Sequence, residues 1–531
     1  GYVTRGGTYY FAVATDAHDA LCDIMKYKAD AGVVSPDPDR LPEAYGSADA
    51  SSVYAFEVEE VMPEPAPDAG TEGSQDGAAV PDADNGVSVP AATDPSTEGD
   101  LSGVPTNKFS AADIRTHDEE FRYLTRSDWE GTFPETYADG HWVAPDEVRG
   151  GMIPDVSYMT EGTAGADSPN AAGGLTAFDL IGAEYGDVRF RYLADMLSRS
   201  EKAEYVRMGG NTISSLGAPV VPETRCRDGQ AGVNPSVIYY SPVINYPSAA
   251  VVAATWNDEL AAALGECLSE DALGEEISGV FAPCLNIRRD PFGGGNGRSF
   301  GEDPLLIGRM GAAEVRGLRT KMCFAFIGDF AFASQEDRAL GLSVWGDEQT
   351  LRTIYLRPFE IAVREGGACA VLQSASRIGT TWVGAHKGLM TDILRTEWGF
   401  EGMTLTARDG DDAFMDFASG IVAGTDMWFN NDPMAFHPSD AQLGSAAVSE
   451  ALTRAAANII YTVTASNAMN GITADTRVER IIPPWQVIYI VLACVVLAAA
   501  LSMPIIVLVN RILTRKKTDS SAYFTTITWD K

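Results

Sequence analysis

Short apolar runs alternate with longer amphipathic segments along the chain from about residue 188 onward. The apolar runs predict buried strands at 280–284, 323–327, 368–372 and 402–406. The longer segments predict helices at 248–265, 304–321, 348–365 and 386–397. This alternation over about 280 residues predicts a parallel α/β sheet, and its length favours a (β/α)8 TIM-like barrel over an open sheet.

The functional residues of such a barrel lie just after its strands. The predicted strands therefore direct the search for a site to four loops, at 286–301, 328–338, 373–377 and 407–412. Upstream, Ser198 and Glu201 have the spacing of a capping box, which is a weaker indication of a helix start.

A run without charge extends from Val487 to Val509 near the end of the chain. As a helix it would measure about 34 Å, enough to cross a hydrocarbon core of about 30 Å. Trp485 and Tyr489 lie where an aromatic belt is expected, and four basic residues follow the run. We therefore expect a single-pass cell-membrane protein with a cytoplasmic tail at 510–531 and the rest extracellular; a buried helix of a soluble protein is the alternative.

The beginning of the chain has a different composition. Residues 8–13 predict a strand, and a short helix follows it. Between residues 41 and 107 there is no Lys or Arg, while acidic residues and prolines recur, so 61–105 is predicted to be a disordered acidic linker. An acidic binding tail is the alternative. Because the chain starts at Gly1 with no leader pattern, we expect that an N-terminal part is missing.

Charge and cysteine content narrow the class of protein. The 531 residues include 74 acidic and 39 basic side chains, a net charge of −35, which argues against nucleic-acid binding. The seven cysteines have no CxxC spacing and are expected to be mostly buried free thiols. The five histidines form no HExxH motif, so neither a metal site nor a cofactor is expected.

The barrel segment carries several motifs in order. They are SRSEKAEYVRMGG at 198–210, DGQAG at 228–232, NYPSAAVVAATWNDELA at 245–261, NIRRDPFGG at 286–294, SFGEDPLLIGRMGAAEVRGL at 299–318, QE at 335–336, TLRTIYLRPFEIAVREGGACAV at 350–371 and LRTEWGFEGM at 394–403. In these motifs the chain resembles glycoside hydrolase family 3, the β-glucosidases and their relatives. The resemblance implies a TIM-like barrel, a role in carbohydrate metabolism and a β-linked glycan or glycoside as ligand.

Residues 1–60 and 105–137 resemble family members with reversed domain order. In that subgroup an α/β sandwich, which carries the acid/base, and a fibronectin-like domain precede the barrel. Together with the linker and the apolar run, the resemblance predicts six parts: the end of a fibronectin-like domain (1–60), the linker (61–105), a pre-barrel segment (106–187), the barrel (188–475), the transmembrane helix (487–509) and the tail (510–531).

The residues that the family uses for catalysis are replaced. Its nucleophile is an Asp that closes the motif read here as GFEGMTLTA at 399–407, so Ala407 occupies that position. Other sugar contacts of the family correspond to Gly295 (an Arg), Arg298 (an acidic residue), Gly328 and Asp329 (a Lys-His pair), and Ala375 and Ser376 (a Tyr-Asn pair). Only Asp228, which resembles the sugar-binding Asp of DGxxG, is retained clearly.

A nearby carboxylate offers a second interpretation. Asp409 follows Ala407 by two residues and would share its face of a strand, about 6.6 Å further along. The first hypothesis is therefore a membrane-anchored, catalytically degenerate homologue that binds carbohydrate or a partner. The second is an active retaining β-glycosidase that hydrolyses O-glycosyl bonds with Asp409 as a relocated carboxylate.

Overall fold

The computed structural model describes two compact units, Gly1–Asn107 and Lys108–Lys531. The residues it describes are 7–14, 17–32, 49–58, 107–116, 162–167, 169–170, 173–234, 244–289, 295–333, 335, 339–408, 415–430, 432, 437–473, 475–477 and 484–521. The predicted linker 61–105 and the candidate Asp409 lie outside these residues.

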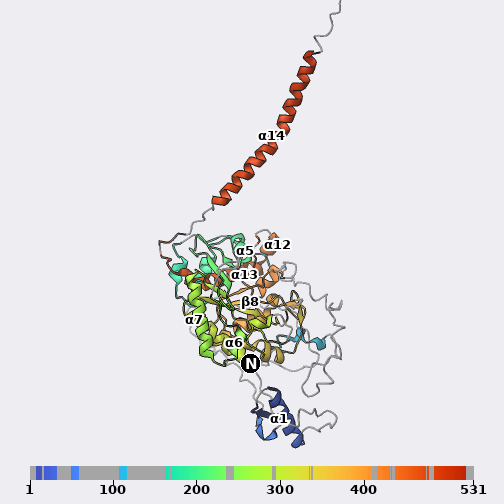
Figure 1. Ribbon diagram of the computed structural model, residues 1–531. Coiled ribbons are helices and arrows are strands. Elements are labelled where there is room, and N and C mark those ends of the chain that lie inside the picture. The colour runs from blue at the N-terminus through green and yellow to red at the C-terminus, as the bar shows by residue number, and fades with distance from the viewer. Residues whose placement is uncertain are drawn as a thin grey trace, which may run out of the picture. The chain divides into compact units, whose positions relative to one another are not determined.

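The first unit contains a pair of strands and a helix, drawn in blue in Figure 1. Strand β1 (Gly7–Ala12) pairs antiparallel with β2 (Val53–Val58), and helix α1 (Ala17–Asp30) lies between them in sequence. Tyr10 of β1 meets Tyr27 of α1 edge to face, with ring centroids 5.9 Å apart. The predicted strand and short helix are confirmed, whereas their assignment to a fibronectin-like domain stays a prediction.

The second unit is built on a six-stranded sheet of order β11-β8-β6-β5-β4-β3. Its strands are β3 (Thr212–Ile213), β4 (Thr224–Asp228), β5 (Gly279–Phe281), β6 (Phe324–Phe330), β8 (Ala370–Gln373) and β11 (Met403–Leu405). The four strands predicted from apolar runs are all present and pair parallel with their neighbours.

The segment 427–429 closes this sheet into a ring. Met427 forms a parallel bridge with Leu405 of β11, and Phe429 forms one with Gly209, just before β3. The amide of Thr406 donates to the carbonyl of Met427 at 3.0 Å, and that of Gly209 donates to Trp428 at 2.9 Å. The predicted barrel class is therefore confirmed.

One strand runs against the others. β3 pairs antiparallel with β4, and the connection between them is a short hairpin closed by a bridge between Leu216 and Val221. A parallel return needs a crossover of a dozen or more residues, which this connection is too short to supply.

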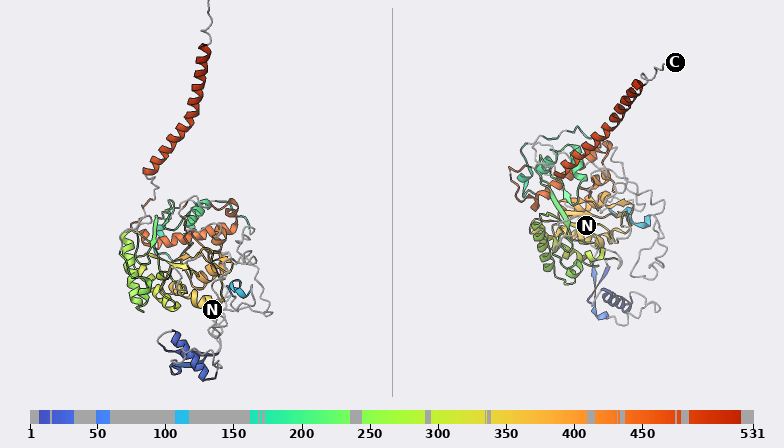
Figure 2. Two further views of the ribbon diagram at one scale, coloured as in Figure 1. Left: turned by 45° about the vertical axis from the view of Figure 1, so that its right-hand side comes forward. Right: turned by 45° about the horizontal axis from the view of Figure 1, so that its top comes forward.

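Helices surround these strands (Figures 1 and 2). They are α4 (Val188–Ala194), α5 (Arg199–Arg207), α6 (Ala249–Ala253), α7 (Asp258–Gly274), α8 (Pro304–Arg319), α9 (Glu348–Thr350), α10 (Arg357–Arg364), α11 (Phe417–Ala423), α12 (Asp440–Leu443), α13 (Ala446–Thr464) and the π-helical turns η8 (Leu351–Tyr355) and η10 (Gly388–Glu397). A small sheet joins β7 (Ser343–Val344), β9 (Arg377–Ile378) and β10 (Thr381–Trp382).

Two predicted helices need correction, and one weak indication is confirmed. The segment 248–265 is not one helix, because Trp256 adopts a φ of 53° and Asn257 then caps α7 through its side chain. Residues 348–365 form α9, η8 and α10 in succession, since Pro358 begins a new helix rather than continuing one. Ser198 and Glu201 do form a capping box at the start of α5.

Helices α7 and α8 pack with their backbones close together. A methyl group on Gly265 would lie 2.2 Å from the carbonyl oxygen of Glu314, and one on Gly317 would lie 2.1 Å from that of Ala262. Both distances are far below van der Waals contact. The two helices of the barrel wall therefore meet at positions where only glycine fits.

The cysteines are free thiols and mostly lie in the interior, as predicted. Cys22, Cys226, Cys284 and Cys323 are buried and Cys369 is half-buried, whereas Cys267 and Cys494 are exposed.

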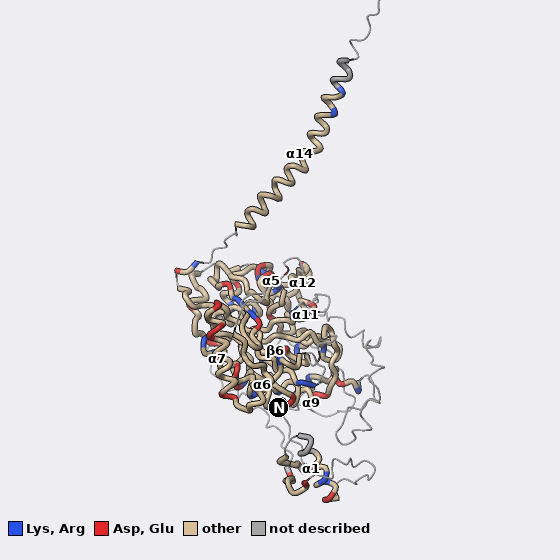
Figure 3. Tube along the Cα trace, viewed as in Figure 1, with Lys and Arg blue, Asp and Glu red and all other residues tan. Residues whose placement is uncertain are grey.

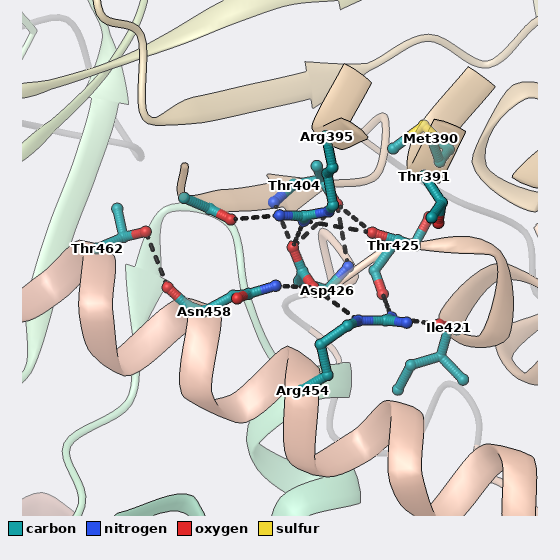
Figure 4. Close-up of polar contacts among 12 residues, drawn as sticks. Met390, Thr391, Arg395, Thr404, Ile421, Thr425, Asp426, Arg454, Asn458 and Thr462 are labelled. Atoms are coloured by element: carbon teal, nitrogen blue, oxygen red, sulfur yellow. Dashed lines mark hydrogen bonds and ion pairs between the residues drawn. The ribbon is translucent and has the colours of Figure 1, made fainter. Parts of the chain in front are cut away.

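A buried carboxylate holds the closing segment in place (Figure 4). Asp426, one residue before the segment, is fully buried and forms an ion pair with Arg395 of η10. Its Oδ2 accepts from the amide of Thr404 at 2.9 Å, and its Oδ1 accepts from Nδ2 of Asn458 at 2.9 Å. Nε of Arg454 lies 3.9 Å from the same Oδ1. Elements η10, β11 and α13 thus meet at one side chain.

The final helix, α14 (Pro484–Ser521), is apolar and exposed along most of its length. Residues 484–515 contain the one segment of the described chain that is long and apolar enough to cross a membrane, with mean hydropathy 2.8 and no part of it buried. Figure 3 shows its basic residues confined to one end.

We predict that Gly317→Ala destabilises the barrel by about 2 kcal/mol or more, because overpacking would push α8 away from α7. Gly274→Ala is the matched control, since a methyl group there meets nothing within 4 Å. Urea unfolding of the full chain followed by circular dichroism measures both free energies. Equal stability of the two variants would contradict the close contact.

We predict that Asp426→Ala lowers the free energy of unfolding by about 3–5 kcal/mol, because it removes a fully buried carboxylate and leaves the half-buried Arg395 and Arg454 without it. Asp475→Ala, at an exposed position, is the control and should change the free energy by less than about 0.5 kcal/mol. The same unfolding measurement applies. A loss below about 1 kcal/mol for Asp426→Ala would show that the network does not hold the ring closed.

Candidate functional site

A cavity of about 560 Å³ lies at the carboxyl ends of the barrel strands. Residues from the ends of β4, β5, β6 and β8 and from the loops after these strands and after β11 line it, together with Phe429 of the closing segment. This is the location where a barrel of this kind places its chemistry. The four loops indicated by the sequence all contribute to its lining.

The candidate residues come together around this cavity. Asp228 ends β4, Gly295 begins the short turn η7 (Gly295–Arg298), and Gly328 and Asp329 belong to β6. Each of them lines the cavity, as do Arg298, Ala375, Ser376 and Ala407. Positions spread over about 180 residues of sequence thus share one site, as the barrel prediction requires.

Three aromatic rings give the lining an apolar part. Phe281, Phe326 and Phe429 are buried, and the ring centroid of Phe281 lies 4.9 Å from that of Phe326 and 5.6 Å from that of Phe429. A mostly apolar wall with a few placed polar groups is typical of a small-molecule site.

Asp228 forms an ion pair with a residue that the sequence reasoning did not single out. Nη2 of Arg408 donates to Oδ1 of Asp228 at 3.2 Å, and the guanidinium carbon lies 4.8 Å from the ring centroid of Phe429. Both charged side chains are exposed, at 47% for Arg408 and 71% for Asp228, so the pair contributes about 1 kcal/mol or less. Arg408 lies in the indicated loop 407–412, but its pairing with a residue 180 positions earlier has no signal in the sequence.

A second ion pair joins two of the replaced positions. Nη2 of Arg298 lies 3.7 Å from Oδ2 of Asp329. The backbone of Asp329 is held by Asn286, which accepts from its amide at 2.6 Å and donates to its carbonyl at 2.9 Å. By the resemblance, Arg298 replaces an acidic residue and Asp329 replaces a basic one. Two positions at which the resemblance implies a change of charge thus lie close together.

The remaining reactive group of the lining is a thiol. Cys284 is buried, and this burial raises its pKa to about 12, so the thiol stays protonated at neutral pH. Its Sγ lies 3.4 Å from Oδ1 of Asn286. Ala407 contributes only a methyl group to the cavity. Among the described residues no group of three or more His, Cys, Asp or Glu could hold a metal ion.

Comparison with known proteins agrees with this architecture. Residues 200–423 match the model of the glycosyl hydrolase family 3 N terminal domain. The chain is 31% identical over 208 residues to beta-glucosidase B of Emericella nidulans, covering 39% of this chain and 24% of that protein. It is 34% identical over 186 residues to a beta-glucosidase of Ruminococcus albus, covering 35% and 19%.

A solved β-glucosidase from Paenibacillus barengoltzii has the same fold, with a TM-score of 0.50 and 22% identity over 64% of this chain and 38% of that one. The chain spans about a quarter of the length of the first curated relatives it matches. The barrel segment is therefore similar to the β-glucosidases of glycoside hydrolase family 3, the family that the motifs indicated.

Proposed function

We propose that this chain is a membrane-anchored family 3 homologue that has lost catalysis and binds a β-linked glycan or a partner through its barrel. The proposal rests on which carboxylates line the cavity and on the residues that they pair with. A retaining glycosidase needs two of them about 5 Å apart, one as nucleophile and one as acid/base. The described lining contains Asp228 and Asp329, and each forms an ion pair with an arginine, while Ala407 holds the nucleophile position.

Carboxylates in such pairs are poor candidates for catalysis. Their oxygens are already engaged by guanidinium groups of the chain itself. Sugar binding does not require a pair of catalytic carboxylates, because aromatic walls and hydrogen-bonding side chains are sufficient for it. The cavity with its phenylalanines and Asp228 supports that role.

The anchor is proposed from α14. Its apolar residues are exposed rather than packed against the described barrel, which favours a lipid environment over a soluble core. With the basic residues after Val509 on the cytoplasmic side, the barrel is extracellular.

We predict that the full chain in detergent hydrolyses aryl β-glucosides at the background rate. Ala407→Asp should leave the rate at background, because the sugar contacts at positions 295, 328 and 329 are replaced as well. Release of the aryl alcohol measures both rates. Robust turnover by the unmodified chain, with a fluorosugar inactivator labelling Asp409, would overturn the proposal in favour of an active glycosidase.

We predict that Asp228→Ala weakens binding of a β-linked oligosaccharide at least about tenfold, since a hydrogen bond to a charged group contributes about 1.5–3 kcal/mol. Isothermal titration calorimetry against a panel of β-glucans measures the dissociation constants, with Asp475→Ala as the control. Equal affinity for Asp228→Ala and the native chain would remove Asp228 from the site. Absence of binding to every glycan would leave a protein partner as the ligand of the barrel.

A further inference from the structure

Helix α14 is longer than a membrane requires. It runs without a break from Pro484 to Ser521, 38 residues, whereas a hydrocarbon core of about 30 Å takes about 20. With Val487 to Val509 in the core, the helix continues through twelve residues beyond it, 510–521. The segment that the sequence marked only as a tail therefore begins as a rigid helix.

The basic residues lie at the start of this extension. At 1.5 Å per residue, Arg511 stands about 3 Å beyond Val509 and Arg515 about 9 Å beyond it. A headgroup layer extends about 5–8 Å on each side of the core, so these two residues bracket its depth. Being four residues apart, they share a face of the helix. Lys516 and Lys517 follow at once, whereas the first acidic residue is Asp519.

The side chain of Arg511 lies along the apolar surface of the helix. It lines a shallow groove with Ala500, Met503, Pro504, Val507 and Leu508. Arg511 thus shares a face of α14 with apolar residues of the preceding turns, where a long aliphatic stem can cover apolar surface while its guanidinium stays in the polar layer. A guanidinium at this depth presents a planar fork of donors that matches a phosphate group.

The charge of this end contrasts with that of the whole chain. Residues 510–531 hold five basic and two acidic side chains, while the full chain has a net charge of −35. An anionic surface would repel the acidic part and attract this segment. The contrast favours an acidic ligand for residues 511–517, on the side of the membrane that the proposed anchoring gives to this segment.

We propose that residues 511–517 of α14 form a binding site for the headgroups of anionic phospholipids in the leaflet that the helix enters. This inference rests on the proposed membrane anchoring. Its chemistry is the phosphate and net negative charge of the lipid, met by two arginines held four residues apart on a preformed helix and by the two lysines that follow.

The test uses the full chain reconstituted in phosphatidylcholine bilayers with spin-labelled phosphatidylglycerol or spin-labelled phosphatidylcholine. Electron paramagnetic resonance gives the fraction of each labelled lipid immobilised by the protein, and hence a relative association constant. We expect the anionic lipid to be preferred at least about fivefold, the factor given by about 1 kcal/mol for one basic residue near the surface. The preference should fall as salt rises to about 1 M, where the Debye length is about 3 Å.

The variant replaces Arg511, Arg515, Lys516 and Lys517 with Gln. In this variant the association constants of the anionic lipid and of phosphatidylcholine should be nearly equal. A matched control replaces the exposed basic residues of the barrel, Arg189, Arg191, Arg309 and Lys321, with Gln and should keep it. A native chain that inserts but shows no preference, or a variant that retains it, would overturn the lipid site. A chain that fails to float with the vesicles would overturn the anchoring itself, so the two failures are distinguished.

Discussion

The ion pairs and hydrogen bonds of Asp426 are the constraint on which the barrel depends. A buried carboxylate costs several kcal/mol unless its oxygens are fully partnered. Here the partners come from η10, β11 and α13, so all three elements must be in place before the charge is stabilised. Met427 to Phe429, which follow directly, close the ring, and Phe429 also lines the cavity. The shape of the site thus follows from one charged residue outside it.

The charged side chains of the cavity lining lie close to partners of opposite charge. Arg298 with Asp329 and Arg408 with Asp228 form two pairs of opposite charges in the described lining. A residue change that left one charge unpaired in a half-enclosed site would be penalised by desolvation. The paired arrangement leaves neither carboxylate without a nearby opposite charge.

The sequence predicted the strands because each is a short apolar run, and it predicted the site because barrel loops converge at one end. It did not predict the break between α6 and α7, since the alanine-rich pattern continues through Trp256 and only Asn257 marks a cap. It did not predict that β3 runs antiparallel, which depends on the length of a loop. The pairing of Arg298 with Asp329, like the convergence of Arg395 and Arg454 on Asp426, lies between distant segments, where charge alone does not specify a partner.

The closing bridge between Gly209 and Phe429 joins positions about 220 residues apart. At about 5–20 residues per second, a ribosome needs about 11–44 seconds to travel from one to the other. During that time β3 is an unpaired edge of an open sheet, joined only near the end by β11 (Met403–Leu405) as the second edge, and an unpaired edge is a template for pairing with another chain. We therefore expect the newly made protein to be most prone to aggregation before its last barrel segment emerges.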